Sequence, residues 1–475
     1  MAYRKDNGDD ESPQQSEMSD YSVTCTLAIA SCLLWTWLVV STPKPMITIC
    51  HVVAAKALLS YTIRPLVSVW SGGTVLFGGN VEWASYNWGL LYQFGFDCSF
   101  ICAYILVYRP LKKARSVAIG VGWAQATLAL SIGLLTLAIM HLLSGGMWLP
   151  SSRTQAVTTL MVGGPVLFRI AAVTLSGAVA LAVAAYFSDA HRRWWRGASI
   201  ALLALLGLIL LYQRGLALIG FLVAGWIATR RVRLGSAQMM GLAVVLLCGV
   251  AALRPVAQTI SRGLVSTTDY ANEYAVSRSD QPTFQETLVS YTNSYAWVDV
   301  WPVVASYIND HGYMGGSGIL NTPASILPFS TRWQIGATTT GDRLNYYYYG
   351  DRYFSTQYGF NVTLPQNIVL NWGSGFIMLG IIPGFIVGRI DTWLCRLKKI
   401  NSWTVFFVIA AVISGGFVGD WGILSYSLGY LLVGGAFYAV FRRSSVEKRR
   451  SSARRLSVRR VVGRGATQQA LSVEK

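Results

Sequence analysis

The sequence predicts an all-α polytopic membrane protein with about eleven transmembrane helices and one large external loop. Three observations lead to this fold class. Hydrophobic residues make up 53% of the 475-residue chain, charged residues only 13%, and the mean hydropathy is +0.44. Eleven apolar stretches approach the roughly 20 residues that a helix needs to cross a bilayer. A long polar segment, residues 255–367, separates the eighth stretch from the ninth.

Each predicted span is an apolar run that ends at polar, basic or glycine-rich residues. Such runs are typical of membrane helices, because the bilayer core offers polar side chains no water to bind. The expected spans are 23–41, 46–63, 85–108, 116–142, 160–187, 198–213, 214–229, 236–254, 368–388, 401–418 and 421–441. The chain therefore divides into a polar N-terminal segment (1–20), transmembrane helices 1–8 (21–254), the external loop (255–367), transmembrane helices 9–11 (368–441) and a basic tail (442–475).

Lysine and arginine gather in the connections that follow odd-numbered spans. The basic connections are 109–115, 191–196, 230–233 and 389–399. Cytoplasmic loops carry such an excess, so we expect these connections and the tail in the cytoplasm, with the N-terminus and the external loop outside. The tail is either a solvated segment that fixes topology or a contact for anionic membrane lipids. The net charge of +18 thus reflects topology, and no nucleic-acid partner is expected.

An aromatic segment, RLNYYYYGDRYFSTQYGF, occupies residues 343–360 near the end of the external loop. Tyrosine combines an apolar ring face with a hydroxyl, which suits sugar rings with apolar C–H faces and hydroxyl rims. The segment therefore predicts a glycan-binding groove. The alternative is an aromatic collar at the lipid headgroups, or the core of the loop itself. The candidate glycan-binding residues are Tyr346, Tyr347, Tyr348, Tyr349 and Tyr353.

Three arginines in the same loop are candidates for binding a diphosphate. The planar guanidinium presents a fork of N–H donors that matches phosphate oxygens. The candidates are Arg332, Arg343 and Arg352. Arg343 and Arg352 each follow an aspartate in a Gly-Asp-Arg motif that recurs after nine residues, so ion pairs within the loop are the alternative interpretation.

Three further residues are candidates for catalysis. Arg214 lies between two short apolar stretches, at the outer end of a predicted helical pair. A charge at membrane depth is costly and is a functional hypothesis by default, although snorkelling to the interface would also explain it. His311 is the first candidate for a general base, because an unperturbed histidine has a pKa of about 6.5. Asp299 is the second.

The motifs of several other protein classes are absent from the sequence. It contains no Walker A loop, no HExxH zinc motif, no Cys-x-x-Cys pair and no Asp-x-Asp pair for a metal–nucleotide complex. It also lacks the matched interrupted helices of a transporter with inverted repeats. We therefore expect no metal, nucleotide or other cofactor, and an enzyme in preference to a carrier.

Four stretches resemble a known family. They are IRPL at 63–66, QRGLAL at 213–218, YINDHGYMGGSGILNTPASILPFSTR at 307–332 and LPQNIVLNWGSGFIMLGIIPGFIVGR at 364–389. With the large external loop, they resemble the Wzy-type O-antigen or oligosaccharide repeat-unit polymerases over roughly residues 46–440. Many members carry a glutamate shortly before an Asn-aromatic-Gly motif. Here Asn-Trp-Gly (371–373) follows Pro-Gln-Asn (365–367), so no carboxylate stands there.

The resemblance implies a metal- and nucleotide-independent membrane glycosyltransferase with a GT-C-like helical architecture. Such an enzyme lies in the bacterial inner membrane and joins polyprenyl-diphosphate-linked oligosaccharides at the periplasmic face. Its implied partners are the lipid-linked substrate and a protein that regulates chain length. Departure of the diphosphate builds negative charge, which fixed cations stabilise. The candidate cations are Arg214, Arg332, Arg343 and Arg352.

Three other functions remain open from the sequence. An O-antigen ligase-like enzyme would use the same donor with a lipid A-core acceptor. A glycolipid flippase or polysaccharide exporter would need a polar cavity that crosses the bundle. A membrane receptor would bind glycans with its loop and would tolerate the loss of Arg214.

Overall fold

The structure, a computed structural model, describes most of the membrane bundle and part of the external loop. The described residues are 13–42, 46–72, 83–109, 117–143, 165–189, 191, 193–211, 214–230, 238, 241, 244–245, 297–321, 324, 329–351, 353, 362–416 and 427–441. Within them the chain is almost entirely helical. In the described part of the chain, six helices are long and apolar enough to cross a membrane: Asp20–Ser41, Ile49–Trp70, Trp83–Val107, Trp123–Leu143, Val166–Ser188 and Ser374–Arg396.

The protein is therefore an all-α, multi-pass membrane protein, as its composition predicts. Shorter apolar helices occupy four of the other expected spans: Trp194–Leu210, Leu216–Thr229, Ser402–Ser414 and Ser427–Phe441. The expected span 236–254 lies almost entirely outside the described residues. The total of eleven spans consequently remains a prediction.

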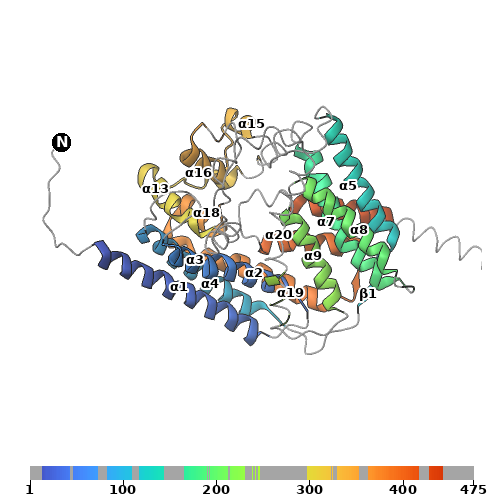
Figure 1. Cartoon of the computed structure of the whole chain (residues 1–475), viewed down its shortest axis with the longest axis horizontal. Helices are drawn as coiled ribbons and strands as arrows, with labels where there is room; N and C mark the ends of the chain where they lie inside the picture. Colours follow the sequence, from blue (N-terminus) through green and yellow to red (C-terminus); the bar gives the residue numbers. More distant parts are fainter. Residues whose placement is uncertain are drawn as a thin grey trace, which may run out of the picture.

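One side of the bundle contains α1 (Pro13–Ser41), α4 (Trp83–Val107) and a continuous helix from Ile49 to Trp70 (Figure 1). That helix consists of α2 (Ile49–Ala57), the π-helical turn η1 (Leu58–Ile63) and α3 (Arg64–Trp70). Pro65 accounts for the wide turn, because proline has no N–H and its ring would clash with the carbonyl four residues earlier. The N–H of Arg64 bonds to Leu59 O, five residues back.

The helix α19 packs along α4 through a row of glycines. A 3₁₀ segment, η6 (Ser374–Gly380), leads into α19 (Ile381–Arg396). Gly380, Gly384 and Gly388 are four residues apart, and all three face α4. A Cβ atom on Gly384 would lie only 2.2 Å from Phe100 O. Small residues at this spacing let two membrane helices approach closely.

The other side of the bundle is centred on α7 (Pro165–Ser188). Its neighbours are α5 (Trp123–Leu143), α8 (Trp194–Leu210), α9 (Arg214–Thr229) and α20 (Ser402–Gly416) (Figure 1). The helix α20 also packs against α2, which joins the two sides. The helix Ser427–Phe441 contacts α20, where the rings of Phe406 and Tyr430 lie 6.4 Å apart.

The basic connections meet at one end of the bundle. There, β1 (Ala118–Ile119) pairs in parallel with β2 (Lys399–Ile400). The backbone N–H of Arg109 donates to Thr392, and Arg230 donates to Leu394 O at 2.8 Å. The indole of Trp123 donates to Asp189, which precedes the basic segment 191–196.

The short helices of the external loop lie at the opposite end (Figure 1). They are η4 (Val298–Val300), α13 (Trp301–His311), α14 (Ser317–Leu320), α15 (Phe329–Gln334), α16 (Thr340–Tyr349) and α18 (Leu364–Trp372). Trp301 fixes these helices to the bundle, because its ring packs directly on Gly89 of α4, where there is no side chain. A Cβ atom on Gly89 would lie 2.1 Å from the Cγ of Trp301.

Candidate functional site

The candidate site begins at the first turn of α16. Thr339 and Asp342 form a capping box there: the Asp342 N–H donates to the Thr339 hydroxyl, and the Thr339 N–H donates to the Asp342 carboxylate. This pairing satisfies two amide groups that a helix N-terminus otherwise leaves open. It also fixes the carboxylate of Asp342 at the helix start, beside Arg343.

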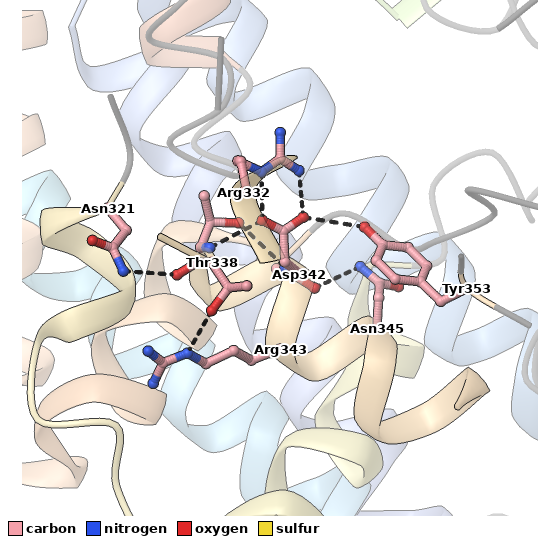
Figure 2. Close-up of polar contacts among 9 residues, drawn as sticks. Asn321, Arg332, Thr338, Asp342, Arg343, Asn345 and Tyr353 are labelled. Atoms are coloured by element: carbon pink, nitrogen blue, oxygen red, sulfur yellow. Dashed lines mark hydrogen bonds and ion pairs between the residues drawn. The ribbon is translucent and has the colours of Figure 1, made fainter. Parts of the chain in front are cut away.

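Arg332 binds that carboxylate in bidentate fashion (Figure 2). Its Nε donates at 2.9 Å and its Nη2 at 2.6 Å, and the exposed fractions of the two side chains are 12% and 4%. The hydroxyl of Tyr353 donates to the same carboxylate at 3.2 Å. Arg332 therefore forms the ion pair within the loop that the sequence left open as an alternative. Its charge is compensated.

Arg343 has a different environment. Its Nε donates to the hydroxyl of Thr338 at 3.1 Å, and its Nη1 donates to the hydroxyl of Ser317 at 3.0 Å. Both partners are neutral, and Arg343 contacts no carboxylate among the described residues. The guanidinium is half-buried and points away from the Arg332–Asp342 pair (Figure 2). Two of its five N–H groups are used in these bonds, and the others have no partner among the described residues.

Three rings form a cluster on the neighbouring faces of α13 and α16. Tyr307 stacks on His311 with ring centroids 4.9 Å apart. Tyr347 meets both rings edge-on, at 5.3 Å from each. Burial raises the pKa of Tyr307, and the nearby charge of Arg343 acts in the opposite direction. We call Arg343, Tyr307, His311 and Tyr347 the arginine–aromatic cluster.

The hydroxyl of Tyr347 donates a hydrogen bond to Asp310. This bond favours the neutral phenol and, with a smaller effect of burial, raises the pKa of Tyr347 to about 12. The ring is thereby held in a fixed direction within the cluster. His311 is the exposed member of the cluster, and the other three are partly buried.

The remaining tyrosines point elsewhere. Four consecutive residues of an α-helix lie about 100° apart around its axis, so the run 346–349 cannot present a single face. Tyr346 packs on Trp333 at 4.5 Å. Tyr348 and Tyr349 contact each other edge-on at 4.8 Å, and Tyr353 is buried against Asp342. Of the five candidate tyrosines, Tyr347 is the one that joins the arginine–aromatic cluster.

Asp299 lies away from this cluster. It belongs to η4, and Arg64 on α3 donates to its carboxylate, with 2.6 Å between Nη2 and Oδ2. Both side chains are fully buried. In this arrangement Asp299 has no solvent-exposed oxygen with which to accept a proton from a substrate.

Two predicted site residues cannot be placed fully. Arg214 begins α9, at the end of the bundle opposite the basic connections, but its side chain is outside the described part of the structure. Arg352 also lies outside the described residues. Among the residues that are described, no three His, Cys, Asp or Glu side chains are grouped to hold a metal ion.

Comparison of the chain with protein-family models, curated proteins and solved structures finds no match.

Sequence reasoning missed Tyr307 as a member of the site. Their spacing could have indicated it, because Tyr307 and His311 are four residues apart and lie on one face when the segment is helical. Together the cluster offers a guanidinium with no carboxylate partner among the described residues, aromatic faces and an exposed imidazole. This combination can bind an anionic group while adjacent rings contact a sugar.

Proposed function

We propose that the chain is a Wzy-type polymerase. It would join polyprenyl-diphosphate-linked oligosaccharide repeat units into a surface polysaccharide at the outer face of the bacterial inner membrane. The observation that carries the proposal is the position of Arg343. Its charge is uncompensated by any described carboxylate, and on α16 it lies one helical turn before Tyr347, at the end of the bundle opposite the basic connections.

The reaction transfers a glycosyl group. An acceptor hydroxyl oxygen forms a bond to the anomeric carbon, and the bond from that carbon to the lipid diphosphate breaks. The leaving diphosphate takes the electron pair, and Arg343 stabilises its growing negative charge. Tyr307 and Tyr347 position the sugar. His311 accepts the proton of the acceptor hydroxyl. Asp299, the other candidate base, would first have to break its ion pair with Arg64.

The test is polymerisation by the purified protein with a polyprenyl-diphosphate repeat unit, in EDTA and without nucleotide. The parent should produce a ladder of lengthening glycans. Arg343→Met should lower the rate by about 10²–10³, as the loss of one such donor does. Arg193→Met, at the basic end, is the matched control and should leave the rate unchanged. A full ladder from Arg343→Met would contradict the role of the cluster.

Two further variants test the wider site. Arg214→Ala should abolish polymer formation in a protein that still folds and inserts, and normal long-chain glycan would argue against its role. Tyr347→Ala should shorten the ladder more than Tyr348→Ala, because Tyr348 lies outside the cluster. Transfer to lipid A-core in place of a ladder would identify a ligase.

Transport is the second candidate function, and buried charges favour it. Lys56 and Asp97 lie inside the membrane bundle, where ionisable groups often mark transport pathways. The cavity beside them measures about 30 Å³, which is far too small for a sugar. Movement of the lipid-linked substrate across vesicles, without any polymer, would support transport.

A further inference from the structure

The helix α8 exposes an apolar stripe along its length. The members of this stripe are 54%, 58%, 45% and 41% exposed, and they are Trp195, Leu202, Leu203 and Leu206. They lie within about 100° of one another around the helix axis. The opposite face, with Ile200, Ala204 and Leu208, is buried against α5 and α7. In a multi-pass membrane protein, lipid is the medium that such an exposed stripe meets.

Two tryptophans stand at the basic end of the stripe. Trp194 and Trp195 begin α8, and the ring of Trp194 is also exposed. They belong to the segment 191–196, which is one of the basic connections. Tryptophan is enriched where hydrocarbon meets headgroups, because its ring is apolar and its N–H is polar. The start of α8 therefore lies at the headgroup level of the leaflet at the basic end.

Arg196 carries a positive charge at the same level. Its guanidinium carbon lies 5.1 Å from the centroid of the Trp195 ring, which is a cation–π contact. Its side chain forms no hydrogen bond or ion pair with any of the described residues. The N–H groups of this planar guanidinium are thus open to the oxygens of a phosphate, whose geometry they match.

The nearest acidic residue along the chain, Asp189, binds other groups. The Trp123 indole donates to its carboxylate at 2.8 Å, and the backbone N–H of His191 donates at 3.1 Å. The Nε of Arg193 lies 3.7 Å from the same carboxylate. Asp189 therefore offsets the charge of Arg193, and among the described residues Arg196 has no counter-ion. A bound anion would supply one.

The stripe has the length of one lipid leaflet. Trp195 and Leu206 are 11 residues apart, which is about 16 Å along a helix. Half of the hydrocarbon core of a bilayer is about 15 Å thick. Ser199 lies on the stripe without interrupting it, because its hydroxyl donates to Trp195 O at 2.9 Å. An acyl chain can therefore follow the stripe from Trp195 to the middle of the bilayer.

We propose that the start of α8 binds one anionic phospholipid of the leaflet at the basic end. The phosphate lies against the guanidinium of Arg196, the indoles of Trp194 and Trp195 lie at headgroup level, and an acyl chain follows the leucines. A soluble phosphate would make no use of the stripe, so the surface fits a lipid. The site is separate from the proposed polymerase site, because the arginine–aromatic cluster lies at the opposite end of the bundle.

The first experiment is photo-cross-linking of the full chain in phosphatidylcholine vesicles. The vesicles contain a trace of alkyne-labelled lipid, either phosphatidylglycerol or phosphatidylcholine with the same acyl chains. The benzophenone amino acid p-benzoylphenylalanine replaces Ser199, which is exposed and lies one turn from Arg196. Phosphatidylglycerol should label this protein more strongly than phosphatidylcholine. Arg196→Gln should lower the ratio of the two labels about fivefold, equivalent to the ~1 kcal/mol that one arginine contributes near anionic lipid.

Two controls make the result specific to this site. Arg193→Gln should leave the ratio unchanged, because Asp189 already offsets the charge of Arg193. With the benzophenone at Leu128, an exposed position on α5, the ratio should not respond to Arg196→Gln. An equal fall in the Arg193→Gln and Arg196→Gln variants would indicate a general attraction to the basic end and would overturn the site. An unchanged ratio in Arg196→Gln would also overturn it.

The second experiment distinguishes a lipid from other occupants. An excess of glycerol phosphate in the buffer should leave the phosphatidylglycerol label at position 199 unchanged, because it lacks the acyl chains that contact the stripe. Loss of the label would indicate a site for soluble phosphates. Cross-links between two copies of the chain, in place of lipid label, would indicate an interface between copies. Either of these two results would overturn the lipid site.

Discussion

Arg64 and Asp299 are 235 residues apart in the chain, and they form a fully buried ion pair between the membrane bundle and the external loop. The pair joins α3 to η4, directly before the helix that carries Tyr307 and His311. The position of the arginine–aromatic cluster over the bundle therefore depends on it.

Asp299→Asn should destabilise the protein strongly. It would remove the carboxylate that binds the buried guanidinium of Arg64, and breaking a buried pair in this way typically costs about 3–5 kcal/mol. Thermal or denaturant unfolding in detergent measures the loss. Arg193→Met is the matched control, because its pair with Asp189 is long, at 3.7 Å, and Arg193 is 37% exposed. Such a surface pair contributes about 0–1 kcal/mol to the free energy of unfolding. A similar loss of stability in both variants would contradict a special role of the Arg64–Asp299 pair in stabilising the protein.

Substitution should separate the roles of two arginines in one short segment. Arg332→Met removes a bidentate charged hydrogen bond and should cost roughly 1.5–3 kcal/mol of stability. Arg343→Met removes hydrogen bonds to two neutral hydroxyls but leaves no buried carboxylate without its partner, so it should cost less than Arg332→Met. Unfolding midpoints of the two variants provide the measurement. The prediction fails if Arg343→Met is the more destabilised of the two.

Gly89→Ala should disturb the contact between α4 and the helices of the external loop. Its Cβ atom would overlap the ring of Trp301, and overpacking of this kind typically costs about 1–3 kcal/mol. Adding Gly89→Ala to Trp301→Gly should cost nothing further, because the ring and the Trp301 Cβ, which lies 2.3 Å from the added Cβ, are then both gone. The unfolding midpoints of the single and double variants test this. Gly435→Ala is the control, since no described atom outside its own stretch of helix lies within 4 Å of its added Cβ.

The phenol of Tyr347 should lose its proton at a higher pH than an ordinary tyrosine. Its pKa is raised from 10.0 to about 12, chiefly because it donates to Asp310. The protonated form is favoured in the folded state, so this hydrogen bond stabilises fully below about pH 10 and is lost between pH 10 and 12. A difference absorbance titration of the parent against Tyr347→Phe should show one phenol with a midpoint near 12. In Asp310→Asn that midpoint should move back toward 10, and an unmoved midpoint would exclude Asp310 as the cause.

The apolar stretches were sufficient to predict the helices of the bundle, because lipid imposes long apolar runs on any helix that crosses it. Their ends were harder to place. The span expected at 368–388 is found at 374–396. The preceding residues form the separate helix α18, which stops at Gly373 with φ +84°, and the apolar pattern continues across this break. The helix expected at 46–63 likewise continues to Trp70, since a π turn accommodates Pro65.

The candidate site was harder to predict than the helices. The sequence indicated that the loop arginines either bind an anion or pair with aspartates, and the structure shows the second arrangement at Arg332. Arg332 pairs, whereas Arg343 contacts two hydroxyls. A single sequence could not separate them, because Ser317 reaches Arg343 only through the packing of α14 on α16. The pairing of Asp299 with Arg64 is equally nonlocal.

The parallel pairing of β1 with β2 has a consequence for biosynthesis. Ala118 and its partner Lys399 are separated by about 280 residues. At the usual rates of translation, roughly 15–55 s pass between synthesis of the first strand and of the second. During that interval the first half of the chain is inserted while its strand has no partner. A factor that protects nascent membrane proteins could act in this window, and the basic end of the bundle would be completed last.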